Sequence, residues 1–215
     1  MSASGVIKAA VRGANPIVTL GQTEVWEVEK ALENETGQKW TPPLGEAKFW
    51  LVRLACTLRN PSGSAEITAA TQSLYLRPVP ASAGEGRVYA YRLFPQRVSV
   101  DEKSSTSLKL DPELGFADGS KVKVGEAGLT IEHSNVFPVI QAYDEGTAAP
   151  SWQFAPHASH PLTGSQFVYA ILVARAPATG LRAHVELTVT TQSAFGPVKY
   201  GTPQAARQHT EFSLG

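Results

Sequence analysis

Two histidines three residues apart are the most suggestive chemical feature of the sequence. His157 and His160 lie in the stretch 151–162, which reads SWQFAPHASHPL and sets a proline beside each of them. Two imidazoles in a restrained loop can face one cation, with Asp144 or Glu145 supplying an oxygen ligand. A metal site needs at least a third ligand, and the spacing alone does not provide it. We therefore favour solvated or locally hydrogen-bonded histidines and predict no metal.

The same stretch has the composition of a contact surface. Trp152 precedes the histidines, and an indole at the end of a sandwich either closes it or offers a flat surface to a ligand. Proline limits the unbound ensemble and tryptophan has few rotors, so such a loop loses little entropy when a partner orders it. We predict Trp152, His157 and His160 as ligand- or partner-binding residues, with closure of the sandwich by Trp152 as the alternative.

Local catalytic motifs are missing from the sequence. We find no G-x-S-x-G turn, phosphate-binding loop, complete dinucleotide fingerprint, H-E-x-x-H or C-x-x-C. The acidic stretch 111–119 lacks the alternating oxygen ligands of a calcium loop. We therefore expect no catalytic residue, no cofactor and no enzymatic activity.

Charge and length bound the class of protein. The chain has 19 Lys and Arg against 19 Asp and Glu in 215 residues, so it lacks the basic surplus that binds nucleic acid. Its length allows a large core, and a hydrophobic share of 42% is ordinary for a globular protein. We predict one sandwich-type domain over 1–215, with an internal division near 101–119 as an open alternative.

The location expected from the sequence is the cytoplasm of a bacterial cell. The first residues show no basic region followed by an apolar run, and no apolar run of eighteen residues occurs. We accordingly expect neither export nor stable transmembrane insertion. The single Cys56 cannot form an internal disulfide, which fits a reducing compartment, and it is expected to be a small buried hydrophobe.

Alternation with a period of two predicts most of the elements. Apolar and polar residues alternate over 183–190, which indicates a strand with one wet face. The segment 121–131 predicts a hairpin, because glycines at its centre allow a tight turn. The segments 49–58 and 167–174 are apolar at nearly every position and are expected to be central strands covered on both sides.

Further segments between turn residues are expected to form strands: 6–11, 16–20, 65–71, 73–77, 87–93, 97–100, 107–110, 136–143 and 209–214. This rhythm predicts an all-β fold, a predominantly antiparallel β-sandwich with little helix. The segment 24–34 fits a helix and a strand equally well.

Two parts of the chain resemble one another. Phe49 and Phe167 each begin an apolar stretch that is followed by a turn with proline and glycine, an alternating strand and Thr-Gln-Ser. Two similar β halves would explain the match. Convergence of two ordinary hairpins explains it as well and is the favoured interpretation.

These observations favour a noncatalytic binding or assembly protein: a scaffold, an adaptor or a subunit of a larger bacterial or phage complex, with a protein partner or self-assembly. The alternative is a membrane-acting β protein, because amphipathic segments rich in serine and threonine, such as 103–110, could rearrange into hairpins. A hydrolase or metal-dependent enzyme without a recognisable motif is the third alternative.

Overall fold

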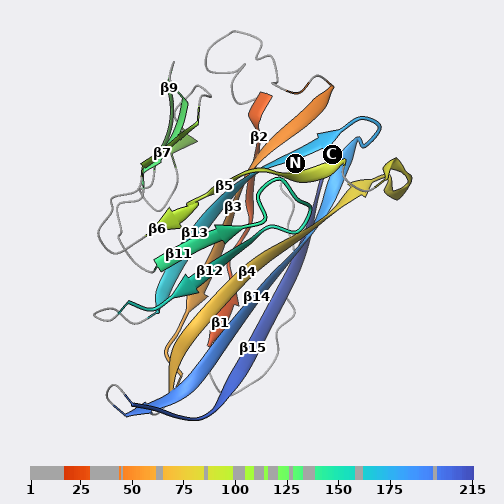
Figure 1. The fold of residues 1–215 in the computed structure, drawn as a ribbon. Coiled ribbons are helices and arrows are strands. Elements are labelled where there is room, and N and C mark those ends of the chain that lie inside the picture. Colours follow the sequence, from red (N-terminus) through yellow and green to blue (C-terminus); the bar gives the residue numbers. More distant parts are fainter. Residues whose placement is uncertain are drawn as a thin grey trace.

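The computed structural model describes residues 17–29, 44, 46–61, 65–84, 87–98, 105–108, 114–115, 121–125, 128–132, 139–157, 162–195 and 198–215. Nearly all of them lie in antiparallel strands, and two sheets pack face to face (Figure 1). The predicted all-β, predominantly antiparallel sandwich is confirmed.

The first sheet is built around two long central strands. Its members are β1 (Val18–Leu20), β2 (Glu24–Glu27), β3 (Ala47–Leu58), β5 (Val88–Phe94) and β13 (Gly164–Arg175). The order is β1-β3-β13-β5, and β2 follows β1 along the same edge of β3. β3 and β13 pair over their whole length, from Gly164 opposite Leu58 to Arg175 opposite Ala47.

The second sheet contains the longest strands of the molecule. Its order is β15 (Val198–Leu214), β14 (Gly180–Phe195), β4 (Ala65–Val79), β12 (Ser151–Ala155), β11 (Val139–Tyr143) and β6 (Arg97–Val98). Figure 1 shows β4, β14 and β15 as long ribbons that curve side by side. The segments 65–71 and 73–77, predicted as two strands, are one continuous strand.

Two apolar clusters cover both faces of the first sheet. One lies between the sheets and includes Trp50, Leu54 and Leu187. The other lies on the far face of the first sheet and includes Phe49, Tyr169 and Ile171. Alternate residues of β3 and β13 enter different clusters, because side chains of a strand point to opposite faces. The prediction of central strands covered on both sides is confirmed.

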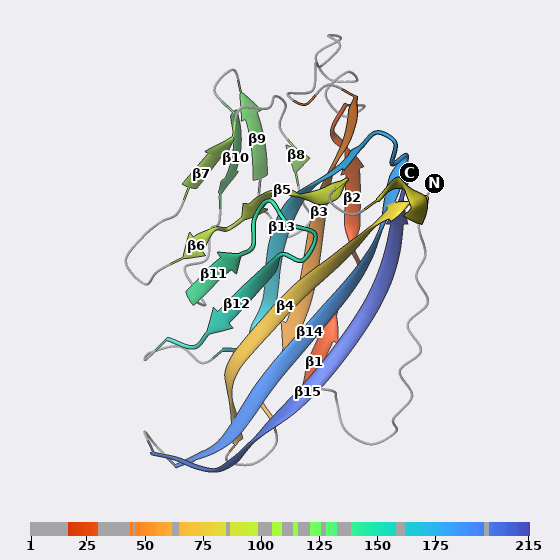
Figure 2. The ribbon, with the colours of Figure 1, turned by 45° about the vertical axis from the view of Figure 1, so that its right-hand side comes forward.

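A third, small sheet belongs to neither layer. It contains β7 (Ser105–Leu108), β8 (Leu114–Gly115), β9 (Lys121–Gly125) and β10 (Gly128–Glu132), in the order β7-β10-β9-β8. Its strands pair only with one another among the described residues, and Figure 2 shows it apart from the long strands, above β6 and β11. β9 and β10 confirm the predicted hairpin.

The two similar segments of the sequence occupy equivalent places in the fold. β3 leads into β4 and β13 leads into β14, and each pair passes from the first sheet to the second. β3 pairs with β13, and β4 pairs with β14. Neither unit is a hairpin, because its two strands lie in different sheets, so the description of the units as hairpins is wrong; duplication and convergence both stay predictions. A turn rich in proline and glycine reverses the chain without fixing the sheet in which the next strand pairs.

One glycine at such a turn is required by close packing. A Cβ atom on Gly180, at the start of β14, would lie 2.1 Å from the carbonyl oxygen of Leu214 on the neighbouring strand β15. The backbone carbonyl has no rotamer by which to move away, so only glycine fits here.

The ambiguous segment 24–34 begins as a strand, because Glu24–Glu27 pair with β3 as β2. Its residues 30–34 and the predicted strand 6–11 lie outside the described residues, as does most of the predicted division at 101–119.

Candidate functional site

The predicted contact loop is divided between core and surface. Trp152 is 0% exposed and packs between the sheets, as expected for an indole that closes the sandwich. His157 is half-buried, and His160 lies outside the described residues. Residues Ser151–Ala155 form strand β12 and not a loop, because Trp152 and Phe154 alternate with polar or small residues and fill the core. Partner binding by these three residues stays a prediction.

The acidic residues proposed as metal ligands have other positions. The carboxylate of Glu145 binds the guanidinium of Arg92 and accepts hydrogen bonds from the backbone of Leu93 and the amide of Gln96, both at 3.0 Å. The next residues hydrogen-bond the backbone of β5, where the Gly146 N–H donates to the Ala90 oxygen at 2.8 Å. Glu145 thus holds the turn between β11 and β12 against β5 through these contacts. Among the described residues, no group of three or more His, Cys, Asp or Glu is arranged to hold a metal ion.

The small third sheet has the most distinctive residue pattern. In the β9–β10 hairpin, Leu129 pairs with Val124 and Ile131 pairs with Val122. Polar pairs alternate with these: Thr130 lies opposite Lys123 between the two apolar pairs, and Glu132 lies opposite Lys121 beyond the second.

The pattern extends into β7. Leu108 pairs with Leu129, and Ser107 pairs with Thr130, although Thr106 stands opposite Ile131. The register therefore sets apolar residues opposite apolar ones and polar residues opposite polar ones within the β9–β10 hairpin, and β7 departs from this at Thr106. The sequence alone predicted the hairpin but not its union with β7.

The connections of this sheet make it separable from the sandwich. It lies within residues 99–138, a single insertion between the short strand β6 and strand β11. Its hydrogen-bonded ladders run only among β7, β8, β9 and β10 in the part of the chain that the structure describes. Moving this segment would therefore break no described ladder of the two main sheets.

The outer face of the second sheet carries a cluster that the sequence did not reveal. The rings of His184 and His209 stack with centroids 5.4 Å apart, and Nδ1 of His184 lies 3.3 Å from Oε1 of Glu211. Tyr75 completes the cluster, with its ring centroid 5.9 Å from that of His184. These residues come from three strands, so only the register brings them together.

No helix among the described residues combines the length and apolar character needed to span a membrane.

Comparison with known proteins gave similarity at the level of fold alone. No family model matches the chain, and no curated protein matches it. Among solved structures, the Clostridium perfringens delta-toxin is 11% identical, with 94% of this chain and 95% of that chain covered and a TM-score of 0.48. The Clostridium perfringens NetB toxin in its membrane inserted form is 12% identical, with 91% and 95% covered and a TM-score of 0.40. A backbone pilin of Streptococcus pyogenes is 12% identical, with 91% of this chain and 35% of that chain covered and a TM-score of 0.40.

Two of these neighbours are toxins, one in a membrane inserted form, and neither is described as a cytoplasmic scaffold or adaptor. The predicted scaffold or adaptor function and the predicted cytoplasmic location are therefore withdrawn. A likeness in fold alone tests neither the expectation of self-assembly nor that of no stable membrane insertion.

Proposed function

We propose that this chain is a membrane-acting β protein without catalytic activity, and that residues 99–138 are the part that enters the bilayer as β-hairpins. The toxin neighbours resemble it in fold only, so the proposal rests on the chain's own residues. The observation that carries it is the third sheet, which pairs with neither main sheet among the described residues and whose β9–β10 hairpin separates apolar from polar pairs.

The physics of a bilayer explains why this pattern matters. A strand that crosses a membrane alternates residues between lipid and a polar interior, and it needs about 9–11 residues to do so. The described strands of the third sheet have two to five residues each, which is too short. Residues 99–138 contain enough chain for two crossing strands and a turn, so the segment would extend its strands as it leaves the sandwich.

Insertion also requires more than one copy of the chain. A backbone polar group without a hydrogen-bond partner costs on the order of several kcal/mol in hydrocarbon. A single hairpin leaves both its edges unpaired. Strands of neighbouring copies must therefore pair with each other, which makes self-assembly part of the proposed mechanism.

The sandwich supplies the rigid frame from which the segment moves. Its central strands are buried on both faces, and Arg53 of β3 joins β2 through an ion pair with Glu24. The guanidinium of Arg53 also lies 5.0 Å from the centre of the Phe167 ring on β13. These contacts hold β2, β3 and β13 together without any residue of 99–138.

Dye release from liposomes tests the proposal directly. The purified chain is added to vesicles filled with a self-quenching dye, and release is followed as protein concentration is varied. We expect release that rises more steeply than in proportion to concentration, because several copies must assemble. Absence of release and of vesicle binding, over a range of lipid compositions with folded protein, would contradict the proposal.

A further inference from the structure

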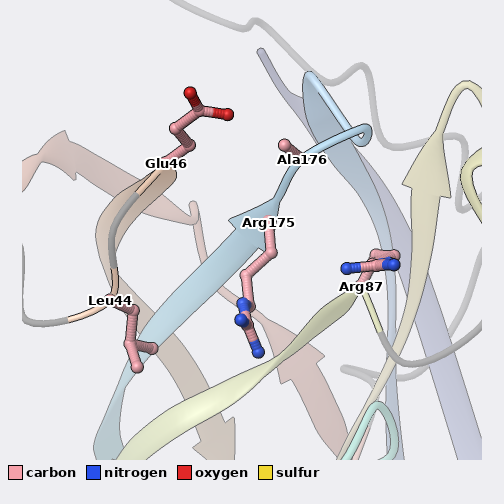
Figure 3. Close-up of a pocket in the computed structure, with 5 residues that line it drawn as sticks. All are labelled: Leu44, Glu46, Arg87, Arg175 and Ala176. Atoms are coloured by element: carbon pink, nitrogen blue, oxygen red, sulfur yellow. The ribbon is translucent and has the colours of Figure 1, made fainter.

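A pocket opens at one end of the first sheet, where β3 and β5 begin and β13 ends. Its volume is about 280 Å³, and its lining residues are Leu44, Glu46, Arg87, Arg175 and Ala176. Figure 3 shows two guanidinium groups at this pocket, while the carboxylate of Glu46 points away from both of them.

The backbone fixes the two arginines as neighbours. The N–H of Arg175 donates to the carbonyl oxygen of Arg87 at 2.8 Å, and the N–H of Ala176 donates to the oxygen of Glu46 at 3.2 Å. Within the described ranges, no carboxylate forms an ion pair with either guanidinium. Both arginine side chains are exposed, and an anion in the pocket could accept hydrogen bonds from both of them. The chain as a whole has no net charge, whereas the pocket lining has two arginines and one glutamate, a formal charge of +1.

We propose that this pocket binds the phosphate group of a phosphate ester. Arginine presents a planar fork of donors that engages two oxygens at once, and two forks from adjacent strands match the several oxygens of a phosphate. Leu44 and Ala176 add apolar surface beside the arginines, which suits the carbon substituent of an ester. The pocket has room for a phosphate group with a small organic substituent.

The phosphate ester has two sources, a soluble metabolite or the headgroup of a lipid. The site does not depend on the proposed membrane activity, because none of its lining residues belongs to 99–138. A soluble probe tests the chemistry, and a vesicle then identifies the source.

The experiment uses sn-glycerol 3-phosphate and titration calorimetry on the full chain. The test variant is Arg87→Ser/Arg175→Ser. The matched control is Arg77→Ser/Arg182→Ser, which removes two exposed arginines that are opposite each other on β4 and β14. Thermal melting checks that both double variants fold.

Saturable binding by the wild type, weakened by about tenfold or more in the test variant and kept in the control, would support the site. No saturable binding by the wild type, or equal loss in both double variants, would overturn it. Cosedimentation with phosphatidic acid vesicles, lost only in the test variant, would identify a lipid headgroup as the source. Binding of the soluble probe without cosedimentation would identify a soluble ester.

Failure of this site and failure of the proposed function are distinguishable. If Arg87→Ser/Arg175→Ser loses phosphate binding but still releases dye, the phosphate site is supported and is independent of membrane insertion. Phosphate binding without any dye release by the wild type contradicts membrane activity and leaves the site intact.

Discussion

Trp152 of β12 and Gln72 of β4 lie directly opposite each other in the second sheet, and both are 0% exposed. The indole Nε1 of Trp152 and both amide atoms of Gln72 are buried without a hydrogen-bond partner among the described residues. A polar group buried in this way costs free energy that an apolar group of the same size does not cost. The unsatisfied polar atoms of this pair therefore lower the free energy of unfolding.

Gln72→Leu should keep or raise the free energy of unfolding, by about 0–2 kcal/mol, because it removes two unsatisfied polar atoms at little change in volume. Urea denaturation followed by circular dichroism measures the change. Gln72→Ala is the control, since it removes the same amide but leaves a cavity, and it should be less stable than Gln72→Leu. A loss of more than about 1 kcal/mol in Gln72→Leu would show that the amide is satisfied in solution.

Trp152→Ala should lower the free energy of unfolding by about 3–5 kcal/mol, because it empties a large site between the sheets. His157→Ala should change it by less than about 0.5 kcal/mol, as expected for a half-buried side chain near the surface. Both are measured by urea denaturation. If Trp152→Ala were as stable as the wild type, its indole would not be a core residue. The contact role of the loop would then regain support.

Burial raises the pKa of the Cys56 thiol from 9.0 to about 12, and a backbone hydrogen bond with Gln166 offsets part of the rise. The unfolded chain therefore loses the thiol proton at a lower pH than the folded chain does. Stability is lost as pH rises above 9, by about 1.4 kcal/mol per pH unit until the folded thiol also ionises.

Cys56→Ala lacks the pH-dependent contribution of the thiol to stability. The difference in unfolding free energy between wild type and variant should therefore shrink steadily from pH 9 upward. Urea denaturation at pH 8, 9 and 10 measures it, and comparison of the two proteins cancels other groups that titrate in this range. A difference that is independent of pH would show that the thiol is not protected by burial.

Period-two patterns predicted the frame of the fold because a strand with one dry face must alternate. Alternation predicted β14, and glycines at the turn predicted the β9–β10 hairpin, whereas β3 and β13 were predicted from segments that are apolar at nearly every position. These patterns failed for β12, where Pro156 and the histidines made a strand resemble a loop.

Functional positions were harder to predict because they depend on contacts between distant segments. Arg87 and Arg175 meet only because β5 and β13 are neighbours, and His184 meets His209 only through the register of β14 with β15. The predicted residues Trp152 and His157 are only five positions apart in sequence, but one lies in the core and the other lies near the surface. Local composition therefore identified chemically distinctive residues without showing which of them share a site.

Charges placed at the apolar register positions of the third sheet should abolish membrane activity. Val122→Asp/Ile131→Asp puts two carboxylates at one cross-strand pair, and each charge costs up to a few kcal/mol on a lipid-facing position. We expect at least about a tenfold loss of dye release. The matched control is Lys123→Asp/Thr130→Asp, which adds the same groups at the adjacent polar pair and should retain release. Equal loss in both variants, with unchanged thermal melts, would argue against a two-sided membrane hairpin.

The most direct test of the central claim is a fluorescence scan of the β9–β10 hairpin. Single cysteines are placed at each position of 121–125 and 128–132 in a Cys56→Ala background and labelled with an environment-sensitive dye. On addition of vesicles, we predict blue-shifted emission at Val122, Val124, Leu129 and Ile131. The intervening polar positions, Lys121, Lys123, Thr130 and Glu132, should keep aqueous spectra. Spectra that do not change on vesicle addition, or that change equally at successive positions, would contradict insertion of this segment as β-strands.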